Sequence, residues 1–295
     1  MTTLTTQSTA LPQRAQTEWT RYTRRFARNL PAVAGLVIFA LIVLAAVFAP
    51  QVAPHDPLEQ DYRSILAPPS AEHPFGTDDL GRDIFSRAIW GARESLRVGV
   101  LASAIAISGG LIFGILSGYV GGWVDSLIQR LVEVLLAFPT ILLVLSIVAA
   151  LGPSLTTVLI AAGISSIPVY VRMVRSTVLI EREKDYVLAS RALGATDFRI
   201  MLHHILPNIV STAIVYVTIG LGGTILATSG LSYVGLGAQP PTPEWGAMLT
   251  EGQRLFRSAW WPAVYPGLCI FVTVASINLL GDGLRAALHS DTSKL

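Results

Sequence analysis

Residues 134–171 read VLLAFPTILLVLSIVAALGPSLTTVLIAAGISSIPVYV and carry no charged side chain. One crossing of a bilayer takes roughly 20 consecutive apolar residues, so this stretch is long enough for two crossings. A turn signal, Gly152-Pro153-Ser154, divides it near the middle. The stretch therefore predicts two transmembrane helices, at about 129–151 and 155–177, joined by a very short loop.

Four further charge-free stretches lie on either side, each longer than a single span requires. They predict four more membrane helices, at about 32–49, 98–124, 208–228 and 260–281. The expected fold is therefore an all-α polytopic membrane protein with six transmembrane helices. Glycines recur every four residues in the second of these helices and predict a smooth ridge for close packing: Gly110, Gly114, Gly118 and Gly122.

The composition agrees with a membrane location. Of the 295 residues, 52% are hydrophobic and only 14% are charged, whereas soluble domains have about 25% charged residues. These values exclude a soluble enzyme, a secreted disulfide scaffold and a disordered protein. The single cysteine, Cys269, cannot form an internal disulfide, and no long block of like charge indicates binding to nucleic acid.

The positions of the basic residues predict the orientation. With both termini cytoplasmic, 14 of the 21 lysines and arginines lie on the cytoplasmic side, in accord with the positive-inside rule. The first apolar run is too long for a signal-peptide core, so we expect an uncleaved span. The predicted regions are a cytoplasmic tail (1–31), a first transmembrane helix (32–50), an extracytoplasmic segment (51–94), a core of five helices (95–283) and a cytoplasmic tail (284–295).

The first tail contains a predicted amphipathic helix at 17–29. Trp19, Tyr22 and Phe26 share one helical face, and four arginines accompany them. A basic, aromatic helix of this kind beside a span is expected to lie along the membrane surface.

No motif indicates a catalytic or metal site. The chain lacks the phosphate-binding loop GxxxxGK[ST] and the zinc motif HExxH, and its five histidines show no metal-ligand spacing. Ionisable residues are nearly absent from the predicted spans, although proton-coupled carriers and redox membrane enzymes usually need them. The sequence therefore predicts no catalytic residue and no ligand set for a metal.

The polar segment 181–208, EREKDYVLASRALGATDFRIMLHHILPN, separates the fourth and fifth predicted spans. Its first part has a helix-forming composition, and Gly194 stands where a helix-terminating glycine belongs. Thr196 can cap a second short helix with Asp197 in its first turn, and Pro207 ends or kinks that helix. The charge count places this helix–turn–helix on the cytoplasmic side.

Two interpretations of this segment are open. A compact knob with small residues around Gly194 suits a groove on another protein, whereas a re-entrant loop would pack only against helices of the same chain. Asp197 is similarly ambiguous, because it can set the second helix for docking or serve as a simple N-terminal helix charge.

The same segment resembles the cytoplasmic "EAA" loop of the permease subunits of ABC importers, whose pattern is E-A-A, three residues, Gly, nine residues, Ile, one residue, Leu-Pro. The matching residues are Ala189, Gly194, Leu206 and Pro207. The sequence departs from the pattern at Leu188, Ser190 and His204. The stretches HPFGTDDLGRDIFSRAIWGARESLRVG (73–99) and SYVGLGAQPPTPEWGAML (232–249) are similar to the dipeptide/oligopeptide branch, and the chain looks most like its C-type permease.

This resemblance implies a type I ABC importer permease (MetI-like) fold in a bacterial or archaeal cytoplasmic (inner) membrane. The implied partners are a second homologous permease, two ABC ATPase subunits and an extracytoplasmic substrate-binding protein. ATP and Mg would bind to the ATPases, so this chain would be a transport subunit without catalysis or a cofactor of its own. The implied cargo is a dipeptide, an oligopeptide or a related small solute such as glutathione or a nickel chelate.

The resemblance also implies an ATPase-docking site in a coupling loop at 178–207. Its expected residues are Tyr186, Ala189, Arg191, Ala192, Leu193, Gly194, Ala195, Asp197, Arg199, Leu206, Pro207 and Asn208. The expected contacts with the binding protein are Asp78, Asp79, Arg82, Asp83, Tyr233, Gln239 and Trp245. The four charged residues in that set have an internal alternative, in which they cap a helix or form salt bridges within their own segment.

An ion-coupled secondary carrier or channel that acts without ATPases is the alternative function. It predicts transport by this chain alone, driven by an ion gradient. The scarcity of ionisable residues in the predicted spans argues against it.

Overall fold

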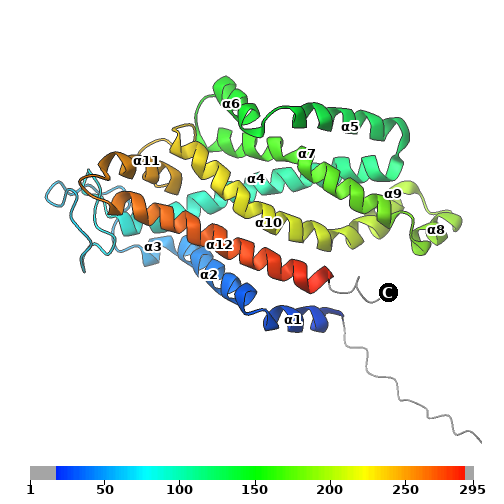
Figure 1. Cartoon of the computed structure of the whole chain (residues 1–295), viewed down its shortest axis with the longest axis horizontal. Helices are drawn as coiled ribbons and strands as arrows, with labels where there is room; N and C mark the ends of the chain where they lie inside the picture. The colour runs from blue at the N-terminus through cyan, green and yellow to red at the C-terminus, as the bar shows by residue number, and fades with distance from the viewer. Residues whose placement is uncertain (1–17, 290–295) are drawn as a thin grey trace, which may run out of the picture.

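The computed structural model describes residues 18–289, and every regular element within that range is a helix apart from one isolated β-bridge between Thr77 and Asp83. Five helical stretches are long and apolar enough to cross a membrane. They are α2 (Leu30–Val47), α4 (Ile84–Val120), α7 (Leu155–Glu181), the continuous stretch Asp197–Tyr233 that contains α10 (Leu206–Tyr233), and α12 (Trp261–His289). Figure 1 shows them running side by side along the long axis of the molecule.

The predicted span at 129–151 is not one continuous helix. The structure has two helices there, α5 (Gly122–Ala137) and α6 (Thr140–Leu151), which are bent by 87° at the break between them. Pro139 explains the break, because proline disfavours the helical conformation of the residue before it. Phe138 accordingly has an extended backbone with φ −89° and ψ 135°.

Helices α4 and α7 pack closely because the predicted glycine ridge lies between them. A Cβ on Gly114 would lie 2.6 Å from Cβ of Val174, and one on Gly118 would lie 2.8 Å from Cβ of Val178. Gly110 lies against Tyr170 one turn earlier. The fourth glycine of the ridge is different, because α4 ends at Val120 and a Cβ on Gly122 would meet nothing within 4 Å.

On the other side of α4 lie α10, α12 and α2. Gly99 of α4 lies against Ile225 of α10, and Gly35 of α2 lies against the backbone of Ser276 in α12. Small residues at helix crossings let backbones approach each other, as is common in membrane bundles. The main apolar cluster fills the space between these helices, with Ile225 and Ile277 fully buried in it.

Two features at one end of the bundle were not predicted from the sequence. Helix α4 begins at Ile84, well before the predicted position 98, because Asp83 caps it: Oδ2 of Asp83 accepts a hydrogen bond from N of Ser86 at 2.7 Å. The segment after the first span therefore consists of the short helix α3 (Ala49–Val52), irregular chain at 53–83, and then α4. The Gly/Pro-rich stretch after α10 leads into a further helix, α11 (Trp245–Leu255).

The bundle has two distinct ends (Figure 1). The irregular segment 53–83 and α11 lie at one of them, which we name the α11 end. The short helices α8 (Asp185–Ala192) and α9 (Asp197–Ile200) lie at the other, which we name the α8–α9 end. Helix α1 (Glu18–Arg28) and the C-terminal part of α12 point toward this second end as well.

Candidate functional site

The helix–turn–helix at residues 185–200 forms as the sequence predicts. Helix α8 ends at Ala192, and Gly194 follows with φ +83°, a left-handed conformation that glycine adopts at little cost. Oγ1 of Thr196 accepts a hydrogen bond from N of Arg199 at 3.4 Å and so caps α9, with Asp197 in the first turn. The structure thus confirms the local prediction for this segment.

The inner face of this helix–turn–helix packs on the ends of α4 and α7. Val187, Ile200 and Ile205 are fully buried there, in an apolar cluster that includes Tyr119 of α4 and Val178 of α7. The segment is therefore fixed to the bundle through its apolar side chains, so its outer face is presented in a defined position.

A polar anchor reinforces this packing. Tyr119, near the C-terminus of α4, donates its hydroxyl hydrogen to Oδ1 of Asp197 at 2.7 Å. Arg191 of α8 donates from Nη2 to the same hydroxyl oxygen at 3.3 Å, and its guanidinium lies 5.6 Å from the centre of the tyrosine ring. Asp197 is therefore more than a simple helix charge, because it joins α9 to α4. Sequence reasoning missed Tyr119, which no loop motif contains.

A second anchor joins α8 to the end of α7. The Tyr186 hydroxyl donates to the Glu181 carboxylate, and Lys184 forms an ion pair with Glu181 at 2.8 Å. Partial burial and the neighbouring carboxylate hold the pKa of Tyr186 well above its ordinary value, so the phenol stays protonated. Ser190 and His204 also hydrogen-bond across the turn, at 3.1 Å.

The outer face exposes large apolar side chains beside charged ones. Leu193 at the turn is 89% exposed and Phe198 of α9 is 68% exposed, values that are costly for large hydrophobic side chains in water. Most of the predicted docking residues are exposed with them: Tyr186, Ala189, Arg191, Ala192, Leu193, Gly194, Asp197, Arg199, Pro207 and Asn208. Ala195 and Leu206 are half-buried.

The prediction that Pro207 ends or kinks the second short helix needs correction. The helix continues from α9 into α10 through one wide π-helical turn, Met201–Ile205, and Pro207 lies in the first turn of α10. The π-helical turn already interrupts the regular α-helical hydrogen-bond pattern directly before Pro207, so the missing N–H of the proline is accommodated there. Asn208 donates from Nδ2 to the carbonyl of His204 at 2.5 Å, beside this turn.

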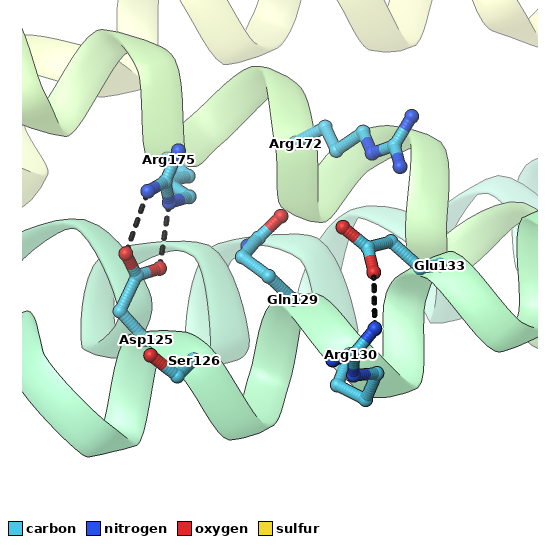
Figure 2. A pocket seen from close by; sticks show the side chains of 7 residues that line it. All are labelled: Asp125, Ser126, Gln129, Arg130, Glu133, Arg172 and Arg175. Atoms are coloured by element: carbon cyan, nitrogen blue, oxygen red, sulfur yellow. Dashed lines mark hydrogen bonds and ion pairs between the residues drawn. The ribbon is translucent and has the colours of Figure 1, made fainter.

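A polar pocket of about 650 Å³ separates α5 from α7 (Figure 2). Arg175 of α7 forms a bidentate pair with Asp125 of α5, from Nε to Oδ1 at 2.7 Å and from Nη2 to Oδ2 at 2.6 Å. Arg130 and Glu133 pair along α5 at 3.5 Å. The Arg175–Asp125 pair therefore holds α5 against α7.

At the α11 end, the charged residues predicted to contact a binding protein are mostly internal. Asp78, Arg82 and Asp83 are at most 4% exposed, so the internal alternative replaces the contact prediction for these three. Nε of Arg82 lies 2.6 Å from Oδ2 of Asp78, and its Nη2 lies 3.0 Å from Oε2 of Glu251 in α11. Arg87 of α4, which is 1% exposed, lies 3.1 Å from the same Glu251 oxygen.

Trp245 is also corrected from a surface contact to a core residue. It is 2% exposed, and its Nε1 donates to the carbonyl of Ala88 in α4 at 2.8 Å. The neighbouring Glu244 caps α11, because its Oε2 accepts from N of Ala247 at 3.0 Å. Of the other predicted contacts, Asp79 and Gln239 are exposed and Tyr233 is half-buried.

An apolar cavity of about 870 Å³ opens between α6, α7 and α10. Its few polar side chains include Thr140, Ser166, Tyr170, Tyr216 and Thr224. A mainly apolar lining with a small number of polar groups is typical of pockets that take small molecules.

Comparison with known proteins identifies the family. Residues 110–294 match the family described as binding-protein-dependent transport system inner membrane component, and residues 17–69 match the N-terminal TM domain of oligopeptide transport permease C. The chain is 44% identical over 274 residues to the dipeptide transport system permease protein DppC of Alkalihalophilus pseudofirmus, an alignment that covers 93% of this chain and 90% of that protein.

The chain is also 45% identical over 278 residues to the glutathione transport system permease protein GsiD of Escherichia coli O1:K1 / APEC, with 94% of this chain and 92% of that protein covered. The fold is similar to a chain of the inward-facing MetNI methionine ABC transporter, with a TM-score of 0.57 and 20% identity over 69% of this chain and 97% of that one. The chain belongs to the family of inner membrane components of binding-protein-dependent transport systems, and within it to the permeases of the oligopeptide C type.

Proposed function

We propose that this chain is one of two permeases in an ATP-driven importer of dipeptides, glutathione or a related small peptide, and that its 185–200 helix–turn–helix seats in the ATPase subunits. The observation that carries the proposal is the exposed apolar surface of Leu193 and Phe198 on a segment that is anchored from behind by Tyr119. A rigid segment with an unpartnered apolar face suits docking into a groove.

The proposed membrane topology has six spans, with the bent pair α5 and α6 as one broken span. The α8–α9 end is then cytoplasmic, and both the start of the described chain and its end lie on that side (Figure 1). The excess of lysine and arginine at this end supports the assignment. The α11 end faces outward, where a binding protein would deliver the cargo.

The cavity between α6, α7 and α10 is the proposed half of the pathway that faces the second permease. Its volume of about 870 Å³ is in the range of small-molecule sites, and Tyr170 and Tyr216 provide hydroxyl groups within an otherwise apolar lining. A second permease placed over this face would close the cavity. The proposal of a small-peptide cargo comes from the related DppC and GsiD proteins.

In the proposed mechanism, closure of the ATPases on ATP moves the docked segment, and the segment moves the spans. Asp197, Arg191 and Tyr119 connect the docking surface to α4, and Glu181, Tyr186 and Lys184 connect it to α7. These links would transmit the motion to both helices together, because α4 and α7 pack along the glycine ridge.

The substitution Gly194→Trp tests the docking proposal. Nothing lies within 4 Å of a Cβ at this position, so the new side chain points into free space and the cost to the fold is the backbone strain of a left-handed residue, about 1–2 kcal/mol. We expect normal membrane insertion, loss of peptide uptake by the complete importer, and at least about 30-fold weaker ATPase binding, since a central interface residue is worth about 2 kcal/mol or more.

Gly152→Trp is the matched control, because Gly152 has φ +87°, is equally free of neighbours and lies beyond the other end of α7. Gly194→Asn is a second control, since asparagine tolerates positive φ. Both should retain ATPase binding. Normal uptake by Gly194→Trp with bound ATPases would refute the docking proposal. Uptake by this chain alone under an ion gradient would support the carrier or channel instead.

A further inference from the structure

Two histidines and an aspartate that lie 10 to 28 positions apart in the sequence converge at the α11 end. One ligand atom from each of His55, His73 and Asp83 lies within 4.8 Å of the others. Nδ1 of His73 lies 3.0 Å from Oδ1 of Asp83, and Nδ1 of His55 lies 3.7 Å from Oδ2 of the same carboxylate. Within residues 18–289 this is the only such group of histidine, cysteine and acidic side chains.

The separations fit a bound transition-metal ion. Ligand atoms about 2.0–2.2 Å from a tetrahedral metal lie about 3.3–3.6 Å from one another, between the two observed distances. The carboxylate is almost fully buried, with 1% of the Asp83 side chain exposed, and His73 is 12% exposed. Small side-chain rotations would therefore bring all three groups onto one ion.

The cluster also contains an unsatisfied ligand atom. Nδ1 of His55 is buried and has no hydrogen-bond partner, although buried polar atoms in proteins almost always have one. The two imidazole rings face one another, with centroids 5.0 Å apart and 35° between their planes. A cation between the carboxylate and the rings would satisfy this nitrogen and would replace the proton that His73 shares with Asp83.

The backbone holds all three residues in place before any ion binds. N of His55 donates to Oγ of Ser86 at 3.1 Å, and Asp83 caps the same first turn of α4. The carbonyl of His73 accepts from N of Ser70 and from N of Gly76, both at 2.8 Å, so His73 lies in a tight double turn. Such preorganisation lowers the entropic cost of binding.

We propose that His55, His73 and Asp83 form a binding site for one divalent ion of the zinc class, which fastens the irregular segment 53–83 to the start of α4. Neutral imidazole and carboxylate are ordinary ligands for zinc, and three protein ligands leave the fourth position to water.

The test uses the full chain in detergent, without a histidine tag, stripped with a chelator and titrated with Zn²⁺ alone. We expect one zinc per chain after gel filtration, measured by elemental analysis. His55→Gln should lower the zinc affinity at least about 10–100-fold, the loss that even second-layer substitutions cause in metal sites. Co²⁺ in the same site should give the visible absorption of a tetrahedral complex, and His55→Gln should abolish that absorption.

His203→Gln is the matched control, because His203 is exposed at the opposite end of the bundle. It should retain the zinc stoichiometry of the unmodified chain. His73→Gln also removes the hydrogen bond between His73 and Asp83, the residue that caps α4. His55→Gln provides the decisive measurement, because Nδ1 of His55 makes no hydrogen bond that the substitution would remove. The proposal is overturned if the unmodified chain retains no zinc, or if His55→Gln binds zinc with unchanged affinity.

Discussion

The two ends of the bundle differ in which side chains they bury and which they leave exposed. At the α11 end, charges are buried and paired inside the chain: Arg82 and Arg87 are at most 3% exposed and share Asp78 and Glu251. At the α8–α9 end, large apolar side chains are left in the open, with Leu193 at 89% exposure. One end pairs its own charged groups, and the other carries the exposed apolar face that we propose as the docking surface.

The buried charges at the α11 end affect the stability of the chain, whereas the exposed apolar face at the α8–α9 end affects the recognition of a partner. A buried charge network costs several kcal/mol of desolvation for each ion, and the chain tolerates it only where every member has a partner. An exposed apolar face contributes nothing to the isolated fold, and becomes favourable when it is covered. Substitutions at the α11 end should therefore change the stability of the chain, whereas those at the α8–α9 end should change its partners.

The largest effect is expected from Arg87→Met. Removing this guanidinium leaves Asp78 and Glu251 with less positive charge in a buried site, and breaking a buried ion pair on one side costs about 3–5 kcal/mol. Thermal unfolding of the purified chain in detergent measures the loss. Arg97→Met is the matched control on the same helix, since its side chain is 67% exposed and should change stability by less than about 0.5 kcal/mol. Equal stability of the two variants would contradict a structural role for the buried network.

The buried network also shows where sequence reasoning stops. The sequence allowed the expectation that Asp78 and Arg82 form salt bridges within their own segment. Nothing in the sequence indicates that Glu251 and Arg87 complete the network. Those contacts join residues more than 160 positions apart, and only the packed helices bring them together. His55, His73 and Asp83 lie only 10 to 28 positions apart, and their convergence was missed because the irregular segment that carries the two histidines has no periodic pattern from which its fold could be predicted.

Local signals were predicted better. The charge-free stretches located the spans, and Gly194, Thr196 and the glycine ridge of α4 each act through neighbours in the chain or one facing helix. The predicted span at 129–151 is interrupted in the structure, because Pro139 keeps the preceding residue out of the helical conformation, an effect that is also local. The early start of α4 was missed because the spans were predicted from charge-free stretches, and four charged residues of α4 precede position 98: Arg87, Arg93, Glu94 and Arg97.

A double substitution tests the exposed apolar face at the α8–α9 end. Replacing Leu193 and Phe198 together by serine removes the exposed apolar face while leaving the buried Val187 and Ile200 untouched. We expect unfolding within about 0.5 kcal/mol of the unmodified chain and at least about 30-fold weaker binding of the ATPases, which can be measured by co-purification and titration. Phe256→Ser, at the α11 end, is the control and should bind ATPases normally. Unchanged ATPase binding by the double variant would mean that this face is not the docking surface.

The smallest effect is expected at Tyr119, which is itself buried but hydrogen-bonds to the exposed helix–turn–helix. Its ring is buried like the residues of the α11 end, but its hydroxyl serves the exposed segment by donating to Asp197 and accepting from Arg191. Tyr119→Phe keeps the packing and removes both hydrogen bonds, a loss of about 1 kcal/mol. The amides of 185–200 should then exchange faster with deuterium, and ATPase affinity should fall about fivefold, while the global unfolding temperature changes little.

Tyr62→Phe, at a tyrosine that is 67% exposed in the irregular segment, should leave both readouts unchanged. If exchange in 185–200 is unaltered in Tyr119→Phe, the buried apolar face alone holds the segment, and the polar anchor has no share in presenting it.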